Sequence, residues 1–422
     1  MITKSKGTYD ILPDEGKKWH LLETAIRKVS ARYNFKEIRT PIFESSDLFH
    51  RSVGESSDIV TKETYDFSDR KGRSITLRPE GTASVVRSVI EHKLYAEANL
   101  PLKYYYVGPM FRYERPQKGR QRQFHQFGAE TLGSNTPLAD AETIAYALDF
   151  LHEIGMQDVT VHINSLGDGQ SKTRYRDQLK VYLKPKINML CEDCQRRFED
   201  NPLRILDCKV DKDNPVLKDA PKPLDWLSDH DKKHFEDVLG YLDAIGIDYM
   251  IDDRLVRGLD YYTHTVFELE ADHESLGAQS VVCAGGRYNH LVKSLNGPDF
   301  PAVGFAFGLE RLLLTIPDEI IEEEGVDLFF IAMGKNVNHK AMSIIKSLRD
   351  NGWSVDYDFF NRSLKAQFKQ AERNKPVYYL IFGDDELSSG TITIKNATTG
   401  NQESVELKDL KTTLASLFTE NA

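Results

Sequence analysis

The sequence predicts an α+β fold with more than one domain. Its 422 residues are typical of two or three domains, and a hydrophobic content of 40% is enough for real cores. Residues 102–130 place aromatic residues before and after a basic turn that contains Pro116 and Gly119, a pattern typical of strand, loop and strand. Beyond residue 326, strands and helices alternate, which indicates a largely parallel sheet with helices on its faces.

The N-terminal segment predicts a helix followed by an extended stretch. Asp14 can cap a helix that runs to about Tyr33. Residues 33–42 include Pro41, which cannot donate a hydrogen bond to a neighbouring strand, so this stretch is expected at a sheet edge or an interface. The apolar stripe of the helix consists of Trp19, Leu22, Ile26 and Val29.

The middle of the chain predicts further elements and one insertion. Residues 75–82 are typical of a strand, a turn and a helix start with Thr82 as its N-cap. An amphipathic helix is expected at 139–151 and a strand at 159–164. In residues 171–245 the charge density rises and helical spacing dominates, which indicates a helical insertion.

The last hundred residues follow an acidic linker at 316–325. Strands are expected at 328–333, 353–359 and 377–382, helices at 340–349, 364–373 and 410–418, and a β-pair within 391–407. The basic residues here are a candidate RNA-binding face, although a solvated helix surface has the same composition. They are Arg362, Lys365, Lys369, Arg373 and Lys375.

A basic cluster in residues 110–130 stands out because the chain is acidic overall, with 55 Lys+Arg against 65 Asp+Glu. This contrast favours one specific polyanion over general nucleic-acid adhesion. Phe124 and several glutamines add a stacking ring and hydrogen-bond donors for base edges. The alternative interpretation is a solvated hairpin with charged decoration. The cluster consists of Arg112, Arg115, Lys118, Arg120 and Arg122.

Two acidic motifs suggest a pocket for a small cation. Glu80 and Thr82 combine an anion with a hydroxyl near a turn, which suits an ammonium group or, equally, a capped helix. Gln126, Gly128 and Glu130 share one strand face, and the glycine would leave room for a ligand. A buried carboxylate needs a partner, and an imidazole would serve. The alternative interpretation, which the local sequence alone favours, is an exposed strand carboxylate.

The apolar runs, the N-terminal residues and the number of cysteines indicate the cellular compartment. No apolar run approaches the length of a membrane span, and residues 1–15 lack the apolar core of a signal peptide. Four cysteines in a chain of this size are not typical of a disulfide framework. The sequence therefore predicts a protein without a membrane segment in the reducing cytoplasm.

The cysteines are expected to be reduced structural thiols. Cys191-x-x-Cys194 and Cys208 supply three thiols, whereas a zinc site wants four ligands, usually as two pairs. His230 or His234 could complete a set, but nothing in their spacing requires it. We therefore expect no metal bound by the protein's cysteines.

Three motifs together resemble those of the class II aminoacyl-tRNA synthetases. Residues 111–124, with Phe111-Arg112-x-Glu114-Arg115 and Arg120-x-Arg122-Gln123-Phe124, resemble motif 2 in its histidyl form. The segment around Pro41 resembles motif 1, and residues 302–311, which end at Arg311, resemble motif 3. Residues 255–263, LVRGLDYYT, resemble the histidine-specific element of histidyl-tRNA synthetases.

The resemblance implies a fold and a reaction. It implies a class II catalytic domain over residues 1–320, a mainly antiparallel sheet with flanking helices, interrupted by the insertion at about 171–245. An α/β anticodon-binding domain is expected at 326–422. The implied activity is histidine–tRNA ligation with ATP and Mg²⁺, acting on L-histidine and tRNA(His), in a homodimer whose interface includes Pro41.

The same resemblance assigns roles to individual residues. Arg257 and Arg112 are expected to be catalytic, with Arg257 reaching the α-phosphate and the histidine carboxylate. The expected histidine-binding residues are Glu80, Thr82, Arg112, Gln126, Glu130, Arg257, Tyr261 and Tyr262, although Tyr261 could equally belong to the core. The expected ATP-binding residues are Arg112, Glu114, Arg120, Phe124 and Arg311. Arg115, Gln117 and Arg122 are expected at the tRNA acceptor end.

Two other classes of protein were weighed against this interpretation. A regulatory paralogue would bind histidine without catalysis, but such proteins usually lack the C-terminal domain and have degraded motifs. A synthetase for threonine, proline or glycine would not be expected to carry the 257–263 string together with Glu130.

Overall fold

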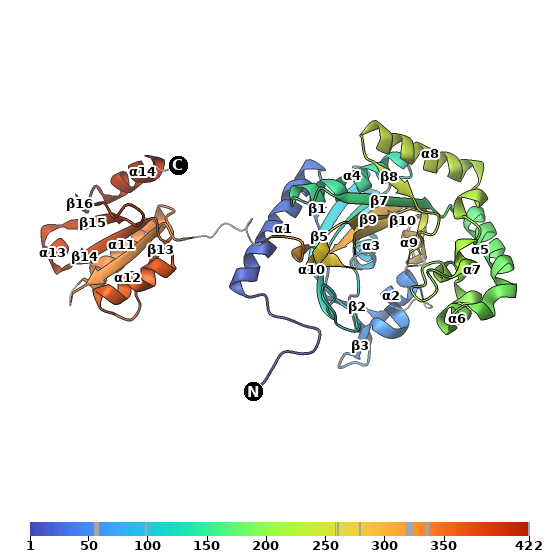
Figure 1. The fold of residues 1–422 in the computed structure, drawn as a ribbon, viewed down its shortest axis with the longest axis horizontal. Coiled ribbons are helices and arrows are strands. Elements are labelled where there is room, and N and C mark those ends of the chain that lie inside the picture. The colour runs from blue at the N-terminus through green and yellow to red at the C-terminus, as the bar shows by residue number, and fades with distance from the viewer. Residues whose placement is uncertain are drawn as a thin grey trace. The chain divides into compact units, whose positions relative to one another are not determined.

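The computed structural model forms two compact units, Met1–Ile320 and Ile321–Ala422 (Figure 1). It describes residues 1–54, 59–97, 99–257, 259, 261–277, 280–317, 325–334 and 337–420. Gly258 and Asp260 of the predicted histidine-specific element therefore lie outside the described residues. Among the described residues, no helix has the length and apolar character needed to cross a bilayer.

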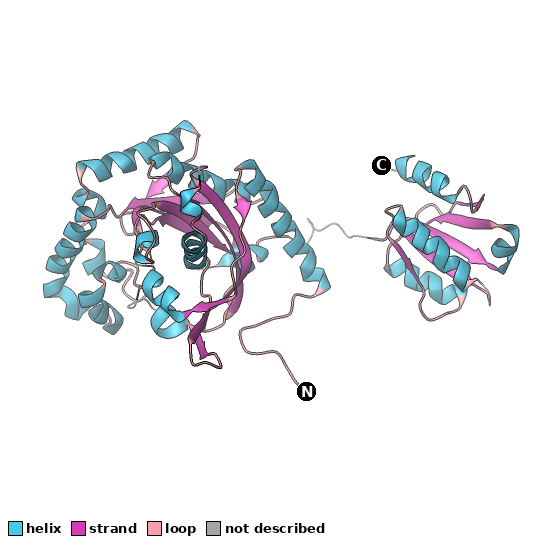
Figure 2. Cartoon of the chain, turned by 180° about the vertical axis from the view of Figure 1, so that it is seen from behind, coloured by secondary structure: helices cyan, strands magenta, loops and turns pink. Residues whose placement is uncertain are grey.

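The larger unit is built on an eight-stranded sheet that is mainly antiparallel, as predicted (Figure 2). Only the edge pairs β1–β5 and β7–β8 run parallel. In spatial order the strands are β1 Lys36–Glu37, β5 Leu102–Phe111, β6 Gln123–Leu132, β11 Ala302–Gly308, β10 Val281–Arg287, β9 Thr263–Ala271, β7 Val159–Ser165 and β8 Tyr249–Ile251. A small sheet beside it pairs β2 Phe43–Ser45, β4 Ser74–Leu77 and β3 Tyr65–Ser68.

Helices cover the two faces of the large sheet differently. One face packs against α1 (Pro13–Arg32), α4 (Pro137–Glu153) and α8 (Asp229–Ala244), with the Phe127 ring among its largest buried side chains. The opposite face packs against α3 (Thr82–Glu91) and α9 (Leu291–Ser294). Because side chains alternate along β6, Gln126 and Glu130 point to the α3 face and leave Phe127 to the core. The remaining helices of this unit include α2 Ser46–Val53 and α10 Leu309–Leu313.

The first helix begins two residues earlier than predicted. Pro13 occupies its first turn and Leu12 is the N-cap, so Asp14 lies inside the helix instead of capping it. Proline is favoured at this position because its missing N–H would have no partner there. Asp14 and Glu15 still stabilise the first turn through the helix dipole.

The predicted helical insertion is present between β7 and β8. It contains α5 Gln170–Leu183, α6 Glu192–Asp200, α7 Pro215–Lys218 and α8, with short 3₁₀ segments between them. Its apolar side chains, which include Tyr175, Leu179 and Cys194, form a cluster with Tyr262 and with Val266 of β9. The insertion therefore shares a core with the large sheet.

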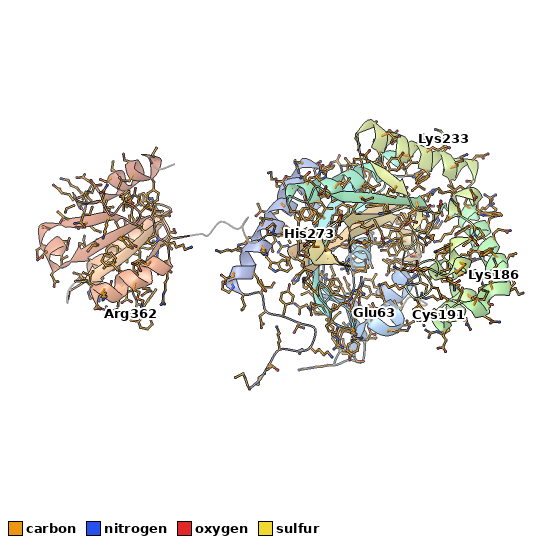
Figure 3. The ribbon with its side chains drawn as sticks, in the orientation of Figure 1. Glu63, Lys186, Cys191, Lys233, His273 and Arg362 are labelled. Atoms are coloured by element: carbon orange, nitrogen blue, oxygen red, sulfur yellow. The ribbon has the colours of Figure 1, made fainter. Side chains whose placement is uncertain are left out.

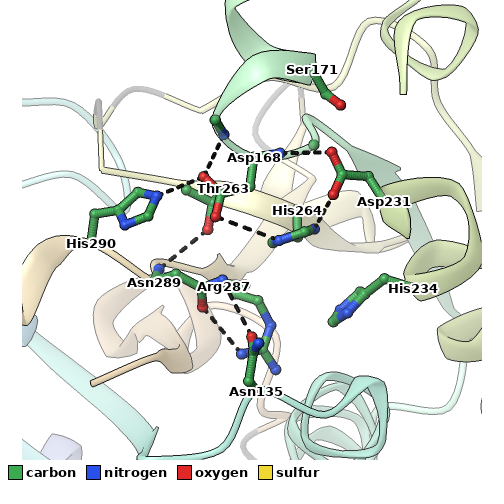
Figure 4. A network of polar contacts seen from close by, with 12 residues as sticks. Asn135, Asp168, Ser171, Asp231, His234, Thr263, His264, Arg287, Asn289 and His290 are labelled. Carbon is green, nitrogen blue, oxygen red and sulfur yellow. Dashed lines mark hydrogen bonds and ion pairs between the residues drawn. The ribbon is translucent and has the colours of Figure 1, made fainter. Parts of the chain in front are cut away.

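A polar network fastens the insertion to the sheet (Figure 4). Asp231 of α8 accepts a hydrogen bond from the backbone N–H of Asp168 at 3.2 Å. The buried His264 ring at the start of β9 lies between these carboxylates, 3.6 Å from Asp168 and 3.8 Å from Asp231. His234 stacks on the same ring, with 4.7 Å between centroids. Burial, followed by the neighbouring His234, lowers the pKa of His264 to about 4.

This network predicts a loss of stability in acid. The folded protein keeps His264 neutral until the pH falls to its pKa of about 4, whereas the unfolded side chain takes up a proton near its ordinary pKa of 6.5. The unfolded state therefore binds more protons as the pH falls from 6.5 to 4, and about 3 kcal/mol of stability is lost across that window. We expect His264→Asn to flatten this part of the profile, measured by urea unfolding.

Asparagine is the replacement of choice because His264 has a φ of +43°, which asparagine tolerates better than most residues. His290→Asn is the matched control, since His290 contacts the same Asp168 at 2.7 Å but is exposed. The control should keep the acid slope of the wild type. Equal slopes in wild type and His264→Asn would contradict the prediction.

The smaller unit has a five-stranded mixed sheet. In spatial order its strands are β13 Val355–Tyr357, β12 Leu328–Met333, β14 Tyr378–Gly383, β15 Thr391–Asn396 and β16 Gln402–Glu406. Its helices are α11 Asn338–Asp350, α12 Leu364–Arg373, α13 Asp384–Ser389 and α14 Leu410–Glu420. β12 runs parallel to β13 and β14, as predicted, and the antiparallel pair β15–β16 is the β-pair expected within 391–407. Within this sheet, the antiparallel β14–β15 pairing is the departure from the largely parallel arrangement. The connections to β15 and β16 are too short for a parallel crossover.

Candidate active site

A cavity of about 290 Å³ opens on the sheet of the larger unit, and three arginines from distant parts of the chain line it. Arg112 follows β5, Arg257 precedes β9, and Arg311 lies on α10. Four further predicted residues line the same cavity: Glu114, Arg120, Phe124 and Gln126. The predicted convergence of the three guanidinium groups on one cavity is therefore present.

Each of these arginines is held by a specific neighbour. Arg112 donates from Nε to the Pro79 carbonyl at 2.9 Å, and its guanidinium lies 5.3 Å from the centre of the Phe124 ring. Arg257 forms an ion pair with Glu268 of β9. Arg311 donates to the carbonyl of Val281. These contacts hold the guanidinium groups in place at the cavity wall.

Carboxylates share the cavity wall with the arginines. Glu114 pairs with Arg120 at 2.9 Å. Glu310 accepts hydrogen bonds from the backbone N–H of His125 at 2.8 and 2.9 Å and lies 2.8 Å from its Nδ1. Glu268 is the third carboxylate of the wall. The cavity thus combines positive charge with hard oxygen ligands.

The three residues predicted to meet the tRNA acceptor end do not line the cavity. Arg115 and Gln117 are exposed in the turn that joins β5 to β6. Arg122 is half-buried, with its guanidinium 3.9 Å from the centre of the Tyr113 ring and its Nε donating to the Glu114 carbonyl at 3.1 Å. A backbone bridge between Gln117 and Arg120 shapes the turn.

Beside the cavity lies a buried carboxylate, Glu130, whose side chain is hydrogen-bonded on both oxygens. Its Oε1 accepts from Thr82 Oγ1 at 2.7 Å and from the Tyr106 hydroxyl at 3.5 Å, and its Oε2 accepts from the Tyr288 hydroxyl. The residue is 1% exposed. Burial raises the pKa of Glu130 to about 8, because the charged form loses its hydration.

Glu80 is a second buried carboxylate in this layer, and it corrects the predicted cap of α3. Its two oxygens accept the backbone N–H groups of Thr82 and Ala83, each at 2.8 Å. Gly81 is the N-cap residue, while Thr82 is the first residue of the helix. The Thr82 hydroxyl is consequently available to Glu130. Burial raises the pKa of Glu80 above its usual range.

Tyrosine rings connect the cavity to these carboxylates. The Arg257 guanidinium lies 5.9 Å from the ring centre of Tyr262, which packs on Tyr261 with 4.7 Å between centroids. Tyr261 in turn lies 5.5 Å from Tyr288, the partner of Glu130. The predicted histidine-binding residues thus form one contiguous layer, even though only some of them line the cavity.

Gly128, on the same strand face as Glu130, makes room for a protein side chain and not for the predicted ligand. A Cβ on Gly128 would lie 2.3 Å from the Tyr106 hydroxyl, so the tyrosine ring fills the space that was expected to admit a ligand. A Cβ on Gly304 of the neighbouring strand would lie 1.9 Å from Glu130 Oε2. Both glycines therefore make room for Glu130 and its partner.

The sequence does not predict three residues of this site. Tyr106 and Tyr288 come from β5 and from the end of β10, and both contact Glu130 only after the strands align. Glu268 alternates with buried residues along β9, and its pairing with Arg257 has no signal in the local sequence. The alternation of polar and apolar residues along β9 could have predicted that Glu268 lies on the face opposite its apolar neighbours, but not that it pairs with Arg257.

Two buried polar atoms of the site have no hydrogen-bond partner among the described residues. They are Oε1 of Gln126 and Nε of Arg257, and both residues line the cavity. Buried polar groups in native proteins are nearly always satisfied, so an unpaired acceptor and an unpaired donor facing one cavity indicate a polar ligand.

Comparison with known proteins places this geometry in a family. The family model described as histidyl-tRNA synthetase matches residues 7–312, and the model described as anticodon binding domain matches residues 327–417. The histidine--tRNA ligase of Anoxybacillus flavithermus is 49% identical over 405 residues, covering 95% of this chain and 96% of its own. That of Listeria innocua is 50% identical over 403 residues, with 95% of both chains covered.

A solved structure agrees with the sequence comparisons. The crystal structure of apo Staphylococcus aureus histidyl-tRNA synthetase is similar to this chain with a TM-score of 0.83 and 43% identity, covering 97% of this chain and 98% of the other. The similarity extends over both units. The chain therefore belongs to the histidyl-tRNA synthetase family.

Proposed function

We propose that this chain joins L-histidine to tRNA(His) at the cavity described above, in two steps. In the first step the histidine carboxylate attacks the α-phosphorus of ATP, giving histidyl-adenylate and pyrophosphate. In the second step the hydroxyl of the terminal adenosine of tRNA attacks the activated carbonyl, and AMP leaves. Family membership supports the overall reaction. We also propose a role in these two steps for individual residues of the cavity.

Charge control is the main demand of the first step, because the nucleophile is already a carboxylate and negative charge accumulates on phosphoryl oxygens. Arg112, Arg257 and Arg311 line the cavity and would supply that stabilisation. We assign Arg257 and Arg112 as catalytic, and Arg311 to the γ-phosphate end of ATP. No side chain is assigned as general base, since the leaving phosphate can accept the proton of the second step.

The observation that carries the histidine assignment is the pair of buried carboxylates beside the cavity. Within the described residues, neither Glu80 nor Glu130 has a lysine or arginine at ion-pair distance. A buried carboxylate without a cation favours a ligand that brings one. We assign Glu80, Thr82 and the unpaired Gln126 oxygen to the α-ammonium group, and Glu130, Tyr261 and Tyr262 to the imidazole side of the pocket.

Phe124 is assigned to the adenine ring, with Glu114 and Arg120 beside it on the cavity wall. We propose that Mg²⁺ accompanies ATP. The carboxylates of Glu114, Glu268 and Glu310 face the cavity and provide the oxygen ligands that this ion prefers. When bound, the ion would neutralise charge on the phosphates.

Two surfaces are assigned to tRNA. The exposed Arg115 and Gln117 and the half-buried Arg122 belong to the turn next to the cavity, and we assign them to the acceptor end. In the smaller unit, which we assign as the anticodon-binding domain, the exposed cations on and around α12 are suited to phosphate contacts. These cations are Arg362, Lys365, Lys369, Arg373 and Lys375.

We further propose a cytoplasmic homodimer. Ile42 and Phe43, next to Pro41, are large hydrophobic residues that remain 43% and 55% exposed in a single chain. Exposed apolar side chains that cluster at a sheet edge are typical of an interface. Native mass spectrometry of the full chain tests this assembly directly.

The reaction predicts exchange of labelled pyrophosphate into ATP that depends on histidine. We expect histidine to support the exchange, and threonine, proline and glycine to give background rates, because only histidine offers an imidazole to the Glu130 layer. A folded protein that binds histidine but gives no exchange would indicate a regulatory paralogue and overturn the assignment. Exchange driven by another amino acid would retain the enzyme class but refute the histidine pocket.

A further inference from the structure

Four potential metal ligands meet in the helical insertion, far along the chain from the cavity residues of motif 2. They are Cys191, Cys194, Cys208 and Asp211, and their ligand atoms all lie within 4.8 Å of one another. Cys191 precedes α6 (Figure 3) and Cys194 lies in its first turn, whereas Cys208 and Asp211 lie in the irregular segment between α6 and α7. Packing of the insertion therefore brings two separate segments together.

The expectation of unligated thiols rested on the lack of a second ligand pair. That reason no longer holds, because Cys208-x-x-Asp211 is a second pair with the same spacing as Cys191-x-x-Cys194. The fourth ligand of the set is the Asp211 carboxylate and not a histidine, so the spacing of cysteines and histidines does not predict it. His230 was a candidate fourth ligand in the sequence. It pairs instead with Asp231, in the network at the base of the insertion.

The distances suit a tetrahedral ion. Cys191 Sγ lies 3.6 Å from Cys208 Sγ, and Cys208 Sγ lies 3.8 Å from Asp211 Oδ2. Zinc bonds to sulfur of about 2.3 Å place two tetrahedral ligands about 3.8 Å apart. These two pairs are thus already at the spacing that a shared ion requires, and all four ligand atoms lie within 4.8 Å of one another.

Burial and charge point the same way. Cys194 is fully buried, Cys208 is 4% exposed and Asp211 is 8% exposed. In the described part of the chain no lysine or arginine pairs with the Asp211 carboxylate, whose hydrogen bonds come from the Cys191 backbone N–H at 2.9 Å and from the Cys208 thiol. A buried carboxylate facing three sulfur atoms lacks a cation, and a metal ion would supply it.

We propose that Cys191, Cys194, Cys208 and Asp211 bind one zinc ion that cross-links the insertion. Three thiolates favour a soft ion over magnesium or calcium, and four protein ligands leave no position open for a substrate. The role is therefore structural. The ion would fasten the start of α6 to the segment that precedes α7.

The test is the metal content of the untagged full-length chain, purified without chelator and analysed by inductively coupled plasma mass spectrometry and native mass spectrometry. We expect one zinc per chain and a lower Tm after chelation. Zinc far below one per chain, or a disulfide between these cysteines in freshly purified protein, would overturn the proposal. The chelated chain should also bind Co²⁺ with the visible absorption of a tetrahedral, thiolate-ligated ion; an octahedral spectrum would refute the site.

Variants separate this site from adventitious binding. Asp211→Asn keeps the shape of the side chain, and since even the loss of an outer-shell partner lowers metal affinity 10–100-fold, we expect at least that loss in a zinc competition titration. Cys208→Ser should lose more zinc affinity than Asp211→Asn. Cys283→Ser is the control, because Cys283 is buried on β10, outside this cluster, and should retain the full zinc content. Wild-type affinity in Asp211→Asn would remove Asp211 from the ligand set and refute the proposed site.

Discussion

Arg257→Ala is expected to bind histidine measurably but to form histidyl-adenylate at least about a hundredfold more slowly than the wild type. Loss of one preorganised donor that acts on developing charge typically lowers the rate 10²–10³-fold, or about 3–4 kcal/mol. Arg257 lines the cavity and is held in place by Glu268, so its charge is positioned before the substrate arrives. The measurement is single-turnover adenylate formation, with histidine binding followed by calorimetry.

The variant also leaves Glu268 without its partner, and this second effect has to be separated from the first. The double variant Arg257→Ala/Glu268→Gln removes the unpaired carboxylate. If the double variant regained the wild-type rate, the loss in Arg257→Ala would come from the unpaired carboxylate and not from the missing guanidinium. Arg254→Ala, an exposed arginine three residues earlier, is the matched control and should be near wild type. Unchanged adenylate formation in Arg257→Ala would refute the assigned role.

Local sequence patterns predict the elements of this fold well and their partners poorly. The apolar stripe of α1 and the alternation along β6 are set by neighbouring residues, and both appear as expected. The mainly antiparallel sheet followed from resemblance, not from periodicity. The parallel character of the smaller sheet was overestimated, because periodicity cannot tell a hairpin from a crossover when a short helix such as α13 intervenes.

The site divides in the same way. Arg112, Arg257 and Arg311 were identified by the motifs around them, and the fold brings them to one cavity. Tyr288 and Glu268 become neighbours of the site only through strand register, which no single segment encodes. Asp211 was missed for a further reason, since carboxylates are too common in sequences for one of them to indicate a metal ligand.

Glu130→Gln is expected to have opposite effects on ligand binding and on the stability of the ligand-free protein. A charged hydrogen bond contributes about 1.5–3 kcal/mol, so losing it should weaken histidine binding at least about 10–100-fold. Glutamine has nearly the same shape and remains neutral at every pH. We expect the thermal shift that histidine produces in the wild type to disappear in the variant.

The pH dependence of the ligand-free protein gives the second measurement. The pKa of Glu130 rises from its ordinary value of 4.5 to about 8 on folding, so between these values the folded state binds more protons than the unfolded state. Stability is therefore lost as the pH rises from 4.5 through 8, by about 3–5 kcal/mol. Glutamine cannot ionise, so this slope should be missing in Glu130→Gln, which should exceed the wild type in stability most clearly near pH 9.

A matched variant distinguishes burial from the mere loss of a charge. Glu91→Gln changes a carboxylate at the other end of α3 that is 61% exposed, and it should alter neither the slope nor histidine binding. If Glu130→Gln kept the histidine-induced shift, the imidazole assignment would fail even with the predicted slope present. If Glu130→Gln kept the wild-type pH dependence of stability, that slope would not come from Glu130. Glu130 would then be ionised in the empty pocket without a cation, and a missing cation could not explain why the pocket binds histidine.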